Sequence, residues 1–270
     1  MIEVLEAAME IAQALILGIV QGLTEWLPIS SSGHLVLLQI ILTSRSSAAS
    51  IALVHAGTLL AVIVAFGRDV FKVIRSFLEG ISELPKGSAF SSPERKLPLY
   101  ILIGTVPVAV LGLALAKYVD EIFGSSKIVG VGLLITAALL YSTKWAGGER
   151  PLDLRRALIV GLAQSIAIFP GISRSGATIS AALLSGLKRE EAVRYSFLLS
   201  IPALTGFLIL ELIVSPVQEI LNPEGLVGLL SSFITGLIAI KFLLSIIRRG
   251  ELHLFSYYCV IVGIAILSLL

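Results

Sequence analysis

The sequence predicts an all-α integral membrane protein, with six transmembrane helices and two re-entrant helix-loop-helix hairpins arranged as an inverted-topology repeat. Three observations lead to this fold class. Of the 270 residues, 56% are hydrophobic and only 14% are charged, whereas a soluble domain carries about 25% charged residues. Six apolar stretches are long enough to cross a bilayer as uninterrupted helices. Two further apolar stretches are broken by polar segments, and these two segments match one another.

The first element, residues 11–43, is interrupted by LPISSSG. Proline removes a backbone donor, and irregular backbone at membrane depth is tolerated only where it lines a cavity inside the protein. We therefore predict a re-entrant pair of short helices here. Three spans of roughly 20 mostly apolar residues follow. They are predicted at 48–67, 97–117 and 127–144, and the loop 68–96 between the first two contains VFKVIRSFLEGI, a predicted amphipathic helix on the membrane surface.

The second half of the chain repeats this layout. Residues 156–187 are interrupted by FPGISRSG, which predicts a second re-entrant hairpin. Three more spans follow, and they are predicted at 192–214, 225–247 and 253–270.

The two interrupted segments align with each other at an offset of 143 residues. GIVQGLTEWLPISSSGHL (18–35) and GLAQSIAIFPGISRSGAT (161–178) are identical at six of eighteen positions. Each copy precedes three spans, and because three is odd, the second copy is inverted relative to the first. Binding sites in inverted repeats lie near the midplane, where broken helices meet. We therefore predict a single membrane domain over 1–270, with repeat one at about 1–147 and repeat two at about 148–270.

Basic residues are distributed unevenly between the two faces that this layout defines. One face carries Arg45, Lys117 and Lys127, against fifteen basic residues on the other. Cytoplasmic loops are rich in Lys and Arg, which predicts a multi-pass protein of the cell (plasma) membrane with both termini outside and the loop 68–96 inside. The fifteen are Arg68, Lys72, Arg75, Lys86, Arg95, Lys96, Lys144, Arg150, Arg155, Arg156, Lys188, Arg189, Arg194, Arg248 and Arg249.

The two polar segments that interrupt the hairpins contain the candidate reactive side chains. Helix N-termini at about Ser32 and Ser175 offer N–H groups to an anion such as phosphate, and Arg174 adds a planar fork of donors. Glu25, with Gln21 one turn earlier, could hold a hard divalent cation through oxygen ligands. A serine beside His34 is the minimum apparatus for nucleophilic or general-base chemistry. Together these features predict phosphoryl transfer at membrane depth.

Structural roles are the alternative for several of these residues. Gly18 and Gly22 suit close helix packing, as do serines at helix crossings. Glu25 could serve only as a partner of Arg174, although charges inside membranes are functional candidates by default. His34 could simply satisfy a backbone carbonyl. The net charge of +2 argues against nucleic acid as a partner, and no sequence feature defines an oligomeric state.

At this point the segments QGLTEWLPISSSGH and FPGISRSGAT, together with LVHAGTLLAV (53–62), can be compared with known families. They resemble the signature segments of the undecaprenyl-diphosphate phosphatase family, the bacitracin-resistance type of membrane phosphatase. The resemblance implies hydrolysis of a polyprenyl diphosphate lipid to the monophosphate and inorganic phosphate, which recycles the lipid carrier for cell-envelope glycan synthesis. It also implies dependence on a divalent cation, Mg²⁺ or Ca²⁺.

The resemblance also implies roles for individual residues. Gln21 and Glu25 match the metal-binding acidic pair, with glutamine in place of the first carboxylate, so a weaker metal site is expected. Ser31 and His34 match the catalytic serine and histidine, and Arg174 matches the phosphate-binding arginine. Ser31 would attack the terminal phosphorus with His34 as base, or His34 would orient water or protonate the leaving group. The remaining candidate substrate-binding residues are Ser30, Ser32, Gly33, Ser173, Ser175, Gly176 and Thr178.

A transporter or flippase for a polyprenyl phosphate is the rival function. Inverted repeats with broken helices are typical of secondary carriers, and a carrier would also use Arg174 and helix N-termini to hold phosphate. The combination of Glu25, Ser31 and His34 favours an enzyme, since a passive phosphate binder does not need it. The phosphatase site is expected to open to the outer face of the membrane.

Overall fold

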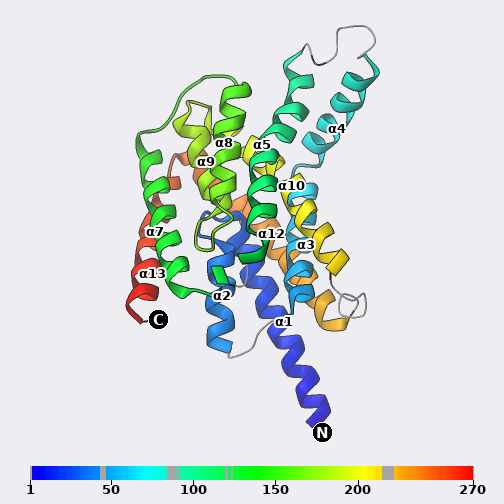
Figure 1. Ribbon diagram of the computed structural model, residues 1–270, viewed down its shortest axis with the longest axis vertical. Coiled ribbons are helices and arrows are strands. Elements are labelled where there is room, and N and C mark those ends of the chain that lie inside the picture. Colours follow the sequence, from blue (N-terminus) through cyan, green and yellow to red (C-terminus); the bar gives the residue numbers. More distant parts are fainter. Residues whose placement is uncertain are drawn as a thin grey trace.

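The protein is all-helical over the residues that the structure, a computed structural model, describes (Figure 1). These residues are 2–42, 47–83, 90, 92–118, 121–122, 124–214 and 222–269. Within them the only β-type pairing is an isolated bridge between Arg150 and Leu187. The predicted all-α class is therefore confirmed.

The first half of the chain supplies the helices α1 (Ile2–Trp26), α2 (Ser31–Leu42), α3 (Ala48–Ala65), α4 (Gly67–Ser82), α5 (Pro93–Leu115) and α7 (Ser126–Ser142). The second half supplies α8 (Leu154–Ile166), α9 (Arg174–Leu184), α10 (Arg189–Val214), α12 (Pro223–Arg249) and α13 (Phe255–Leu269). Short 3₁₀ turns, η2 (Ala116–Tyr118), η3 (Thr143–Trp145) and η4 (Leu252–Leu254), complete the described helical segments.

Six helical stretches are long and apolar enough to cross a membrane, and each overlaps one predicted span. They are Ala48–Ala65, Pro93–Tyr118, Ser126–Trp145, Arg189–Glu211, Pro223–Arg249 and Leu252–Leu269. Large apolar side chains cover their outer surfaces; Leu113, Leu210 and Ile261 are 69%, 56% and 68% exposed. Surfaces this apolar fit lipid rather than water. The six spans are thus confirmed in length and composition. Arg45 and Lys86, two of the residues in the charge argument, lie outside the described residues.

The amphipathic helix predicted in the loop 68–96 is present as α4. Phe71, Ile74 and Leu78 are 66%, 53% and 61% exposed and follow one another at helical spacing on one face. Arg194 on α10 forms an ion pair with Asp69 in the first turn of α4, with Nη2 2.7 Å from Oδ1. This contact ties α4 to the helix bundle.

The two polar segments break their helices where the sequence predicts. α1 ends at Trp26 and α2 begins at Ser31, whereas α8 ends at Ile166 and α9 begins at Arg174. Between them Ser30 has a φ of 69° and Gly171 a φ of 90°, a left-handed conformation that reverses the chain and that glycine adopts most readily. The predicted helix starts, near Ser32 and Ser175, are each one residue late.

Figure 1 shows how the two broken pairs are arranged. α1 runs from the lower end of the view toward the middle, and α2 returns toward the lower end. α8 runs from the upper end toward the middle, and α9 returns upward. The ends of α1 and α8 therefore lead toward the interior of the molecule from opposite sides.

Glycines allow these helices to pack closely against spans from the other half of the chain. A Cβ at Gly18 on α1 would lie 2.4 Å from the carbonyl oxygen of Gly228 on α12. A Cβ at Gly161 on α8 would lie 2.5 Å from the carbonyl oxygen of Gly104 on α5. Neither site has room for a methyl group, so the close-packing interpretation of Gly18 is confirmed, and Gly22 is enclosed in the same way.

Candidate active site

The first tip, residues 27–34, is organised by Ser30. The Ser30 hydroxyl accepts a hydrogen bond from the Gly33 N–H at 3.3 Å, which caps the N-terminus of α2. Its side chain also lies 3.3 Å from the Ser32 hydroxyl. The strained backbone of Ser30 is thus held by the helix that it starts.

The second tip, residues 169–176, has the same construction. The Ser173 hydroxyl accepts from the Gly176 N–H at 3.1 Å and lies 3.2 Å from the Ser175 hydroxyl. These three serine and glycine positions are those of the first tip shifted by 143 residues. Thr136 on α7 secures the loop, since its hydroxyl donates to the Gly171 carbonyl and accepts from the Ser173 N–H, each at 2.9 Å.

The two tips meet around Glu25. Arg174 Nη2 donates to Glu25 Oε1 at 2.5 Å, across 149 residues of sequence. The Ser175 hydroxyl donates to the Leu27 carbonyl at 3.3 Å. A Cβ at Gly176 would lie 3.3 Å from the Cβ of Pro28. The structure therefore brings the predicted acid and the predicted arginine into direct contact.

Glu25 also joins two other predicted residues. The Ser31 hydroxyl donates to Glu25 Oε2 at 2.6 Å, and Gln21 Nε2 donates to the same oxygen at 3.0 Å. The Glu25 side chain is only 5% exposed, so these donors and the arginine replace the water that a carboxylate loses on burial. Glu25 is the point on which Gln21, Ser31 and Arg174 converge.

His34 is held differently from the expectation. Its Nδ1 lies 2.8 Å from the Ser30 carbonyl oxygen and its Nε2 lies 2.7 Å from the Tyr258 hydroxyl. The structure gives it no hydrogen bond to Ser31, whose hydroxyl points to Glu25 instead. The backbone contact proposed as the structural alternative for His34 is present, and the serine–histidine pair is not formed. The Ser30 carbonyl, one turn back, bonds the Nδ1 side of the ring, and the Ser31 proton is already donated to Glu25.

Thr178 lies apart from this centre. Its hydroxyl donates to the Arg174 carbonyl at 2.7 Å and lies 2.6 Å from the Ser196 hydroxyl. The side chain is fully buried between α9 and α10. Thr178 therefore stabilises the first turn of α9 from the side that packs on α10, and its hydroxyl does not bond Glu25.

Two polar atoms at the centre are buried without a hydrogen-bond partner among the described residues. They are Arg174 Nη1, a charged donor, and Gln21 Oε1, an acceptor beside the Glu25 carboxylate. An unmet donor of this kind suits an anion, and an unmet oxygen next to a carboxylate suits a hard cation. Over the described chain, no group of three or more His, Cys, Asp or Glu side chains could hold a metal by itself.

Three residues that the sequence analysis did not single out support the site. Trp26 is fully buried, and the Arg174 guanidinium lies 5.0 Å from the centre of its ring, a cation–π contact. Tyr258 contacts His34, and Thr136 holds the second tip. Trp26 could have been found from its place beside Glu25. Tyr258 and Thr136 lie in apolar spans far from either motif, and nothing in the sequence marks them.

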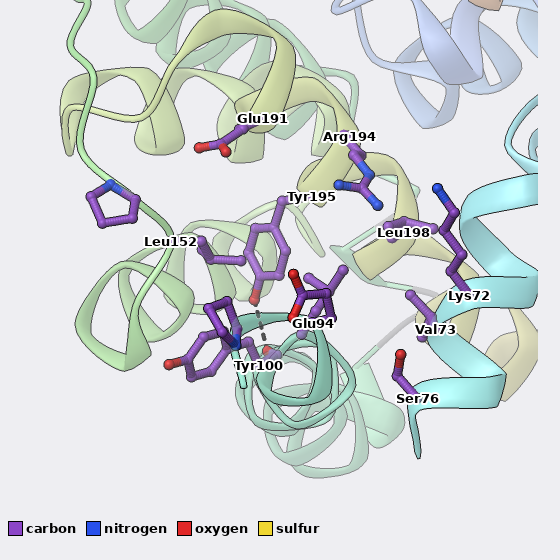
Figure 2. Close-up of a pocket in the computed structure, with 13 residues that line it drawn as sticks. Lys72, Val73, Ser76, Glu94, Tyr100, Leu152, Glu191, Arg194, Tyr195 and Leu198 are labelled. Carbon is purple, nitrogen blue, oxygen red and sulfur yellow. Dashed lines mark hydrogen bonds between the residues drawn. The ribbon is translucent and has the colours of Figure 1, made fainter. Parts of the chain in front are cut away.

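A cavity elsewhere in the molecule contains none of the predicted site residues. It lies between α4, α5 and α10 and is lined by Lys72, Glu94, Arg194 and Tyr195 among others (Figure 2). The Tyr195 hydroxyl donates to the Tyr100 carbonyl at its wall, at 2.7 Å. Its charges are mixed, and the nucleophile and paired acid described above are not part of it.

Comparisons with known proteins agree with the motifs. The sequence model of the family described as bacitracin resistance protein BacA matches residues 14–265. The chain is 96% identical over 262 residues to the undecaprenyl-diphosphatase of Korarchaeum cryptofilum (strain OPF8), which covers 97% of this chain and 100% of that protein. It is 40% identical to the undecaprenyl-diphosphatase of Methanosphaera stadtmanae, over 95% of this chain and 96% of that protein. It is also 40% identical to undecaprenyl-diphosphatase 3 of Bacillus anthracis, over 96% and 98%.

Proposed function

The chain belongs to the bacitracin resistance protein BacA family, and from this premise we propose that it hydrolyses undecaprenyl diphosphate to the monophosphate and inorganic phosphate. It is thus a membrane phosphatase acting on a phosphoanhydride, and the reaction returns the lipid carrier to cell-envelope glycan synthesis. The comparisons favour hydrolysis over the carrier alternative, since the relatives are named as phosphatases.

The observation that supports the catalytic assignment is the convergence of both tips on Glu25. A hydroxyl, a carboxylate and a guanidinium lie within hydrogen-bond distance, and the carboxylate is buried. A nucleophile activated by an adjacent base, with fixed positive charge for the phosphate, is the arrangement that phosphoryl transfer requires. Each tip alone supplies only part of this arrangement.

The first chemical step follows from the direction of the Ser31 hydroxyl. Ser31 Oγ attacks the terminal phosphorus while its proton passes to Glu25, which already accepts that hydrogen bond. The bond between phosphorus and the bridging oxygen breaks, and undecaprenyl monophosphate leaves with its electron pair. A water oxygen then attacks the phosphorus of the phosphoserine and the bond from phosphorus to Ser31 Oγ breaks. Glu25 returns its proton to Ser31 Oγ, and the hydrogens of the water leave with inorganic phosphate. This assignment makes Glu25 the base for Ser31 and leaves His34 the other roles expected from the sequence, which are to orient water or to protonate the leaving group.

Arg174 connects substrate binding to this step. One guanidinium nitrogen is bonded to Glu25, and the other is buried without a partner among the described residues. The terminal phosphate takes up the free Nη1 and competes for Nη2. Because the arginine is then shared, less positive charge holds the Glu25 carboxylate, which becomes a better acceptor for the Ser31 proton. Trp26, beneath the guanidinium, keeps its plane fixed.

A divalent cation fits the residues present if the substrate completes its coordination. Gln21 Oε1 has no hydrogen-bond partner among the described residues, and Gln21 Nε2 bonds Glu25. Gln21 Oε1 and the Glu25 carboxylate would hold Mg²⁺ or Ca²⁺. Mg²⁺ is commonly bound by one or two protein carboxylates together with substrate phosphates. When bound, the cation would neutralise charge on the diphosphate.

The membrane arrangement is the second part of the proposal: α1–α2 and α8–α9 are re-entrant hairpins of an inverted repeat. The matched contacts of the two halves support it. Gly18 packs on Gly228, and its counterpart Gly161 packs on Gly104. In each contact, the first helix of one hairpin packs against a span from the other half of the chain. A two-fold axis in the membrane plane requires such a pair of matched contacts.

The same proposal gives the protein an orientation in the plasma membrane. The excess of basic residues, fifteen against three, favours both termini outside. Figure 1 is compatible with this, since α1 begins and α13 ends toward the lower part of the molecule, whereas α4 and the start of α5 lie at the upper part. In this orientation the first hairpin enters from the outer face, and the diphosphate reaches Glu25 from that side.

The experiment that tests the function is phosphate release from undecaprenyl diphosphate by the purified protein. Release should depend on Mg²⁺ or Ca²⁺ and stop when a chelator removes them. Ser31→Ala should lose turnover while remaining folded. Wild-type protein that binds the lipid without releasing phosphate would contradict the proposal.

A further inference from the structure

Both ring nitrogens of His34 have a hydrogen-bond partner, and these two partners fix the tautomer of the ring. The Ser30 carbonyl can only accept a hydrogen bond, so Nδ1, 2.8 Å away, carries the proton. In the neutral ring, Nε2 is then the acceptor, and the Tyr258 hydroxyl at 2.7 Å is its donor. The lone pair of His34 available for chemistry is therefore directed at Tyr258.

A tyrosine hydroxyl suits this position for a specific reason. A hydroxyl both donates and accepts hydrogen bonds. It can donate to Nε2 of the neutral ring and accept from Nε2–H of the protonated ring. The imidazole of His34 can therefore gain or lose a proton at Nε2 without turning away from Ser30.

The helix that carries Tyr258 is fixed to the first tip by more than this one contact. The next residue, Cys259, is buried with its Sγ 3.7 Å from the Pro28 carbonyl oxygen. One turn further along α13, Gly263 packs against α7, where a Cβ would lie 3.1 Å from the Gly130 carbonyl oxygen. Tyr258 thus lies on a helix that packs against both the first tip and α7, and these contacts place its hydroxyl beside His34.

We propose that Tyr258 is a positioning residue for the phosphatase reaction, which holds His34 through Nε2 in the orientation and tautomer used in catalysis. The inference rests on the proposed function and deepens it, because it assigns a role to a residue of the last span. His34 works with Tyr258 on one side of the tip, while Ser31 works with Glu25 on the other. The two pairs are separate units, although their members are three residues apart.

Tyr258→Phe tests this with Tyr257→Phe as a matched control. Both changes remove one hydroxyl and keep the ring, and the Tyr257 ring packs against Tyr141. Tyr258→Phe should lower kcat about 10-fold with little change in KM, since an ordinary hydrogen bond contributes about that much, while Tyr257→Phe should behave as wild type. In a His34→Ala background, Tyr258→Phe should cause no further loss, because its effect passes through His34. An equal loss in both backgrounds would overturn the proposal.

A readout independent of turnover separates this inference from the proposed function. Diethyl pyrocarbonate acylates the unprotonated imidazole nitrogen, and mass spectrometry can follow it at His34 alone. Modification should be faster in Tyr258→Phe than in wild type and unchanged in Tyr257→Phe. If wild type hydrolyses the lipid and both tyrosine variants match it in kcat and modification, Tyr258 has no positioning role and the function stands. If wild type hydrolyses nothing, the function fails, and the modification rates still decide whether Tyr258 caps His34.

Discussion

At the scale of single residues, the site depends on one buried carboxylate. Glu25 has donors from its own helix, from the start of the next helix, and from the other half of the chain. Removing one partner of a buried charge costs far more than an exposed pair contributes. Substitutions around Glu25 should therefore affect both catalysis and the docking of the tips.

Arg174→Lys is the sharpest test of the shared centre. Lysine keeps the charge but cannot bond Glu25 and the phosphate with two nitrogens of one plane. kcat/KM should fall roughly 10²-fold, about 2.7 kcal/mol, as for the loss of one strong transition-state donor. Arg155→Lys, at an exposed arginine on α8, is the control and should leave phosphate release unchanged. Full activity in Arg174→Lys would remove the arginine from the mechanism.

Gln21→Glu addresses the cation. The substitution keeps an oxygen ligand beside Glu25 and adds a negative charge, so the cation concentration for half-maximal activity should fall while turnover persists. Titrating activity with Mg²⁺ and with Ca²⁺ in wild type and variant measures the shift. An unchanged titration would place Gln21 away from the cation, and its unpaired Oε1 would need another explanation.

Motif and local chemistry predicted most of these residues, but not all of their partners. Glu25, Ser31 and Arg174 are predictable because they are polar groups in apolar surroundings, and the structure brings them together. The structure contains no hydrogen bond between Ser31 and His34, because nearness in sequence does not decide which partners a hydroxyl and a ring select. The Ser30 carbonyl and the Tyr258 hydroxyl lie within hydrogen-bond distance of the two ring nitrogens of His34. The contact with Tyr258 spans 224 residues of sequence, so a helix pattern cannot predict it.

At the scale of helices, the glycines of α1 and α8 decide how closely the hairpins approach the opposite spans. The helix breaks were predictable from Pro28, Gly171 and the serine caps, since each acts on its own backbone. The pairing of α1 with α12 and of α8 with α5 was not, because it depends on surfaces that meet only after folding.

Gly18→Ala should destabilise the protein, because the added Cβ would meet Gly228 O at 2.4 Å and Ser231 Oγ at 1.9 Å. Overpacking of this kind costs about 1–3 kcal/mol, which would appear as a lower thermal unfolding midpoint in detergent. Gly206→Ala is the matched control on α10, where nothing lies within 4 Å of the added carbon. It should be neutral or slightly stabilising, since alanine favours helix. Equal effects of the two changes would contradict the close approach of α1 and α12.

At the scale of the whole molecule, composition determined the class, and the span count followed from it. A run of about 20 apolar residues indicates a helix that crosses the membrane. The six spans could therefore be predicted within a few residues of the ends of their helices. How the spans pack into one bundle depends on contacts that no single stretch of sequence contains.

Orientation can be tested with two introduced cysteines. Gly147→Cys lies on the connection between α7 and α8, and Gly124→Cys on the exposed connection before α7. A membrane-impermeant thiol reagent added to intact cells should label Gly124→Cys and not Gly147→Cys. The native Cys259 is fully buried and gives no background. Labelling of Gly147→Cys and not of Gly124→Cys would show the opposite orientation in the membrane.

The contact between Glu25 and Arg174 also has a consequence for biosynthesis. The two residues are 149 positions apart, and a ribosome adds roughly 5–20 residues per second. For about 7 to 30 seconds, the first tip exists without the arginine that compensates its acid. The nascent first half must therefore keep Glu25 protonated or in contact with water at the membrane surface. Final burial of the first tip therefore has to wait for translation of the second tip.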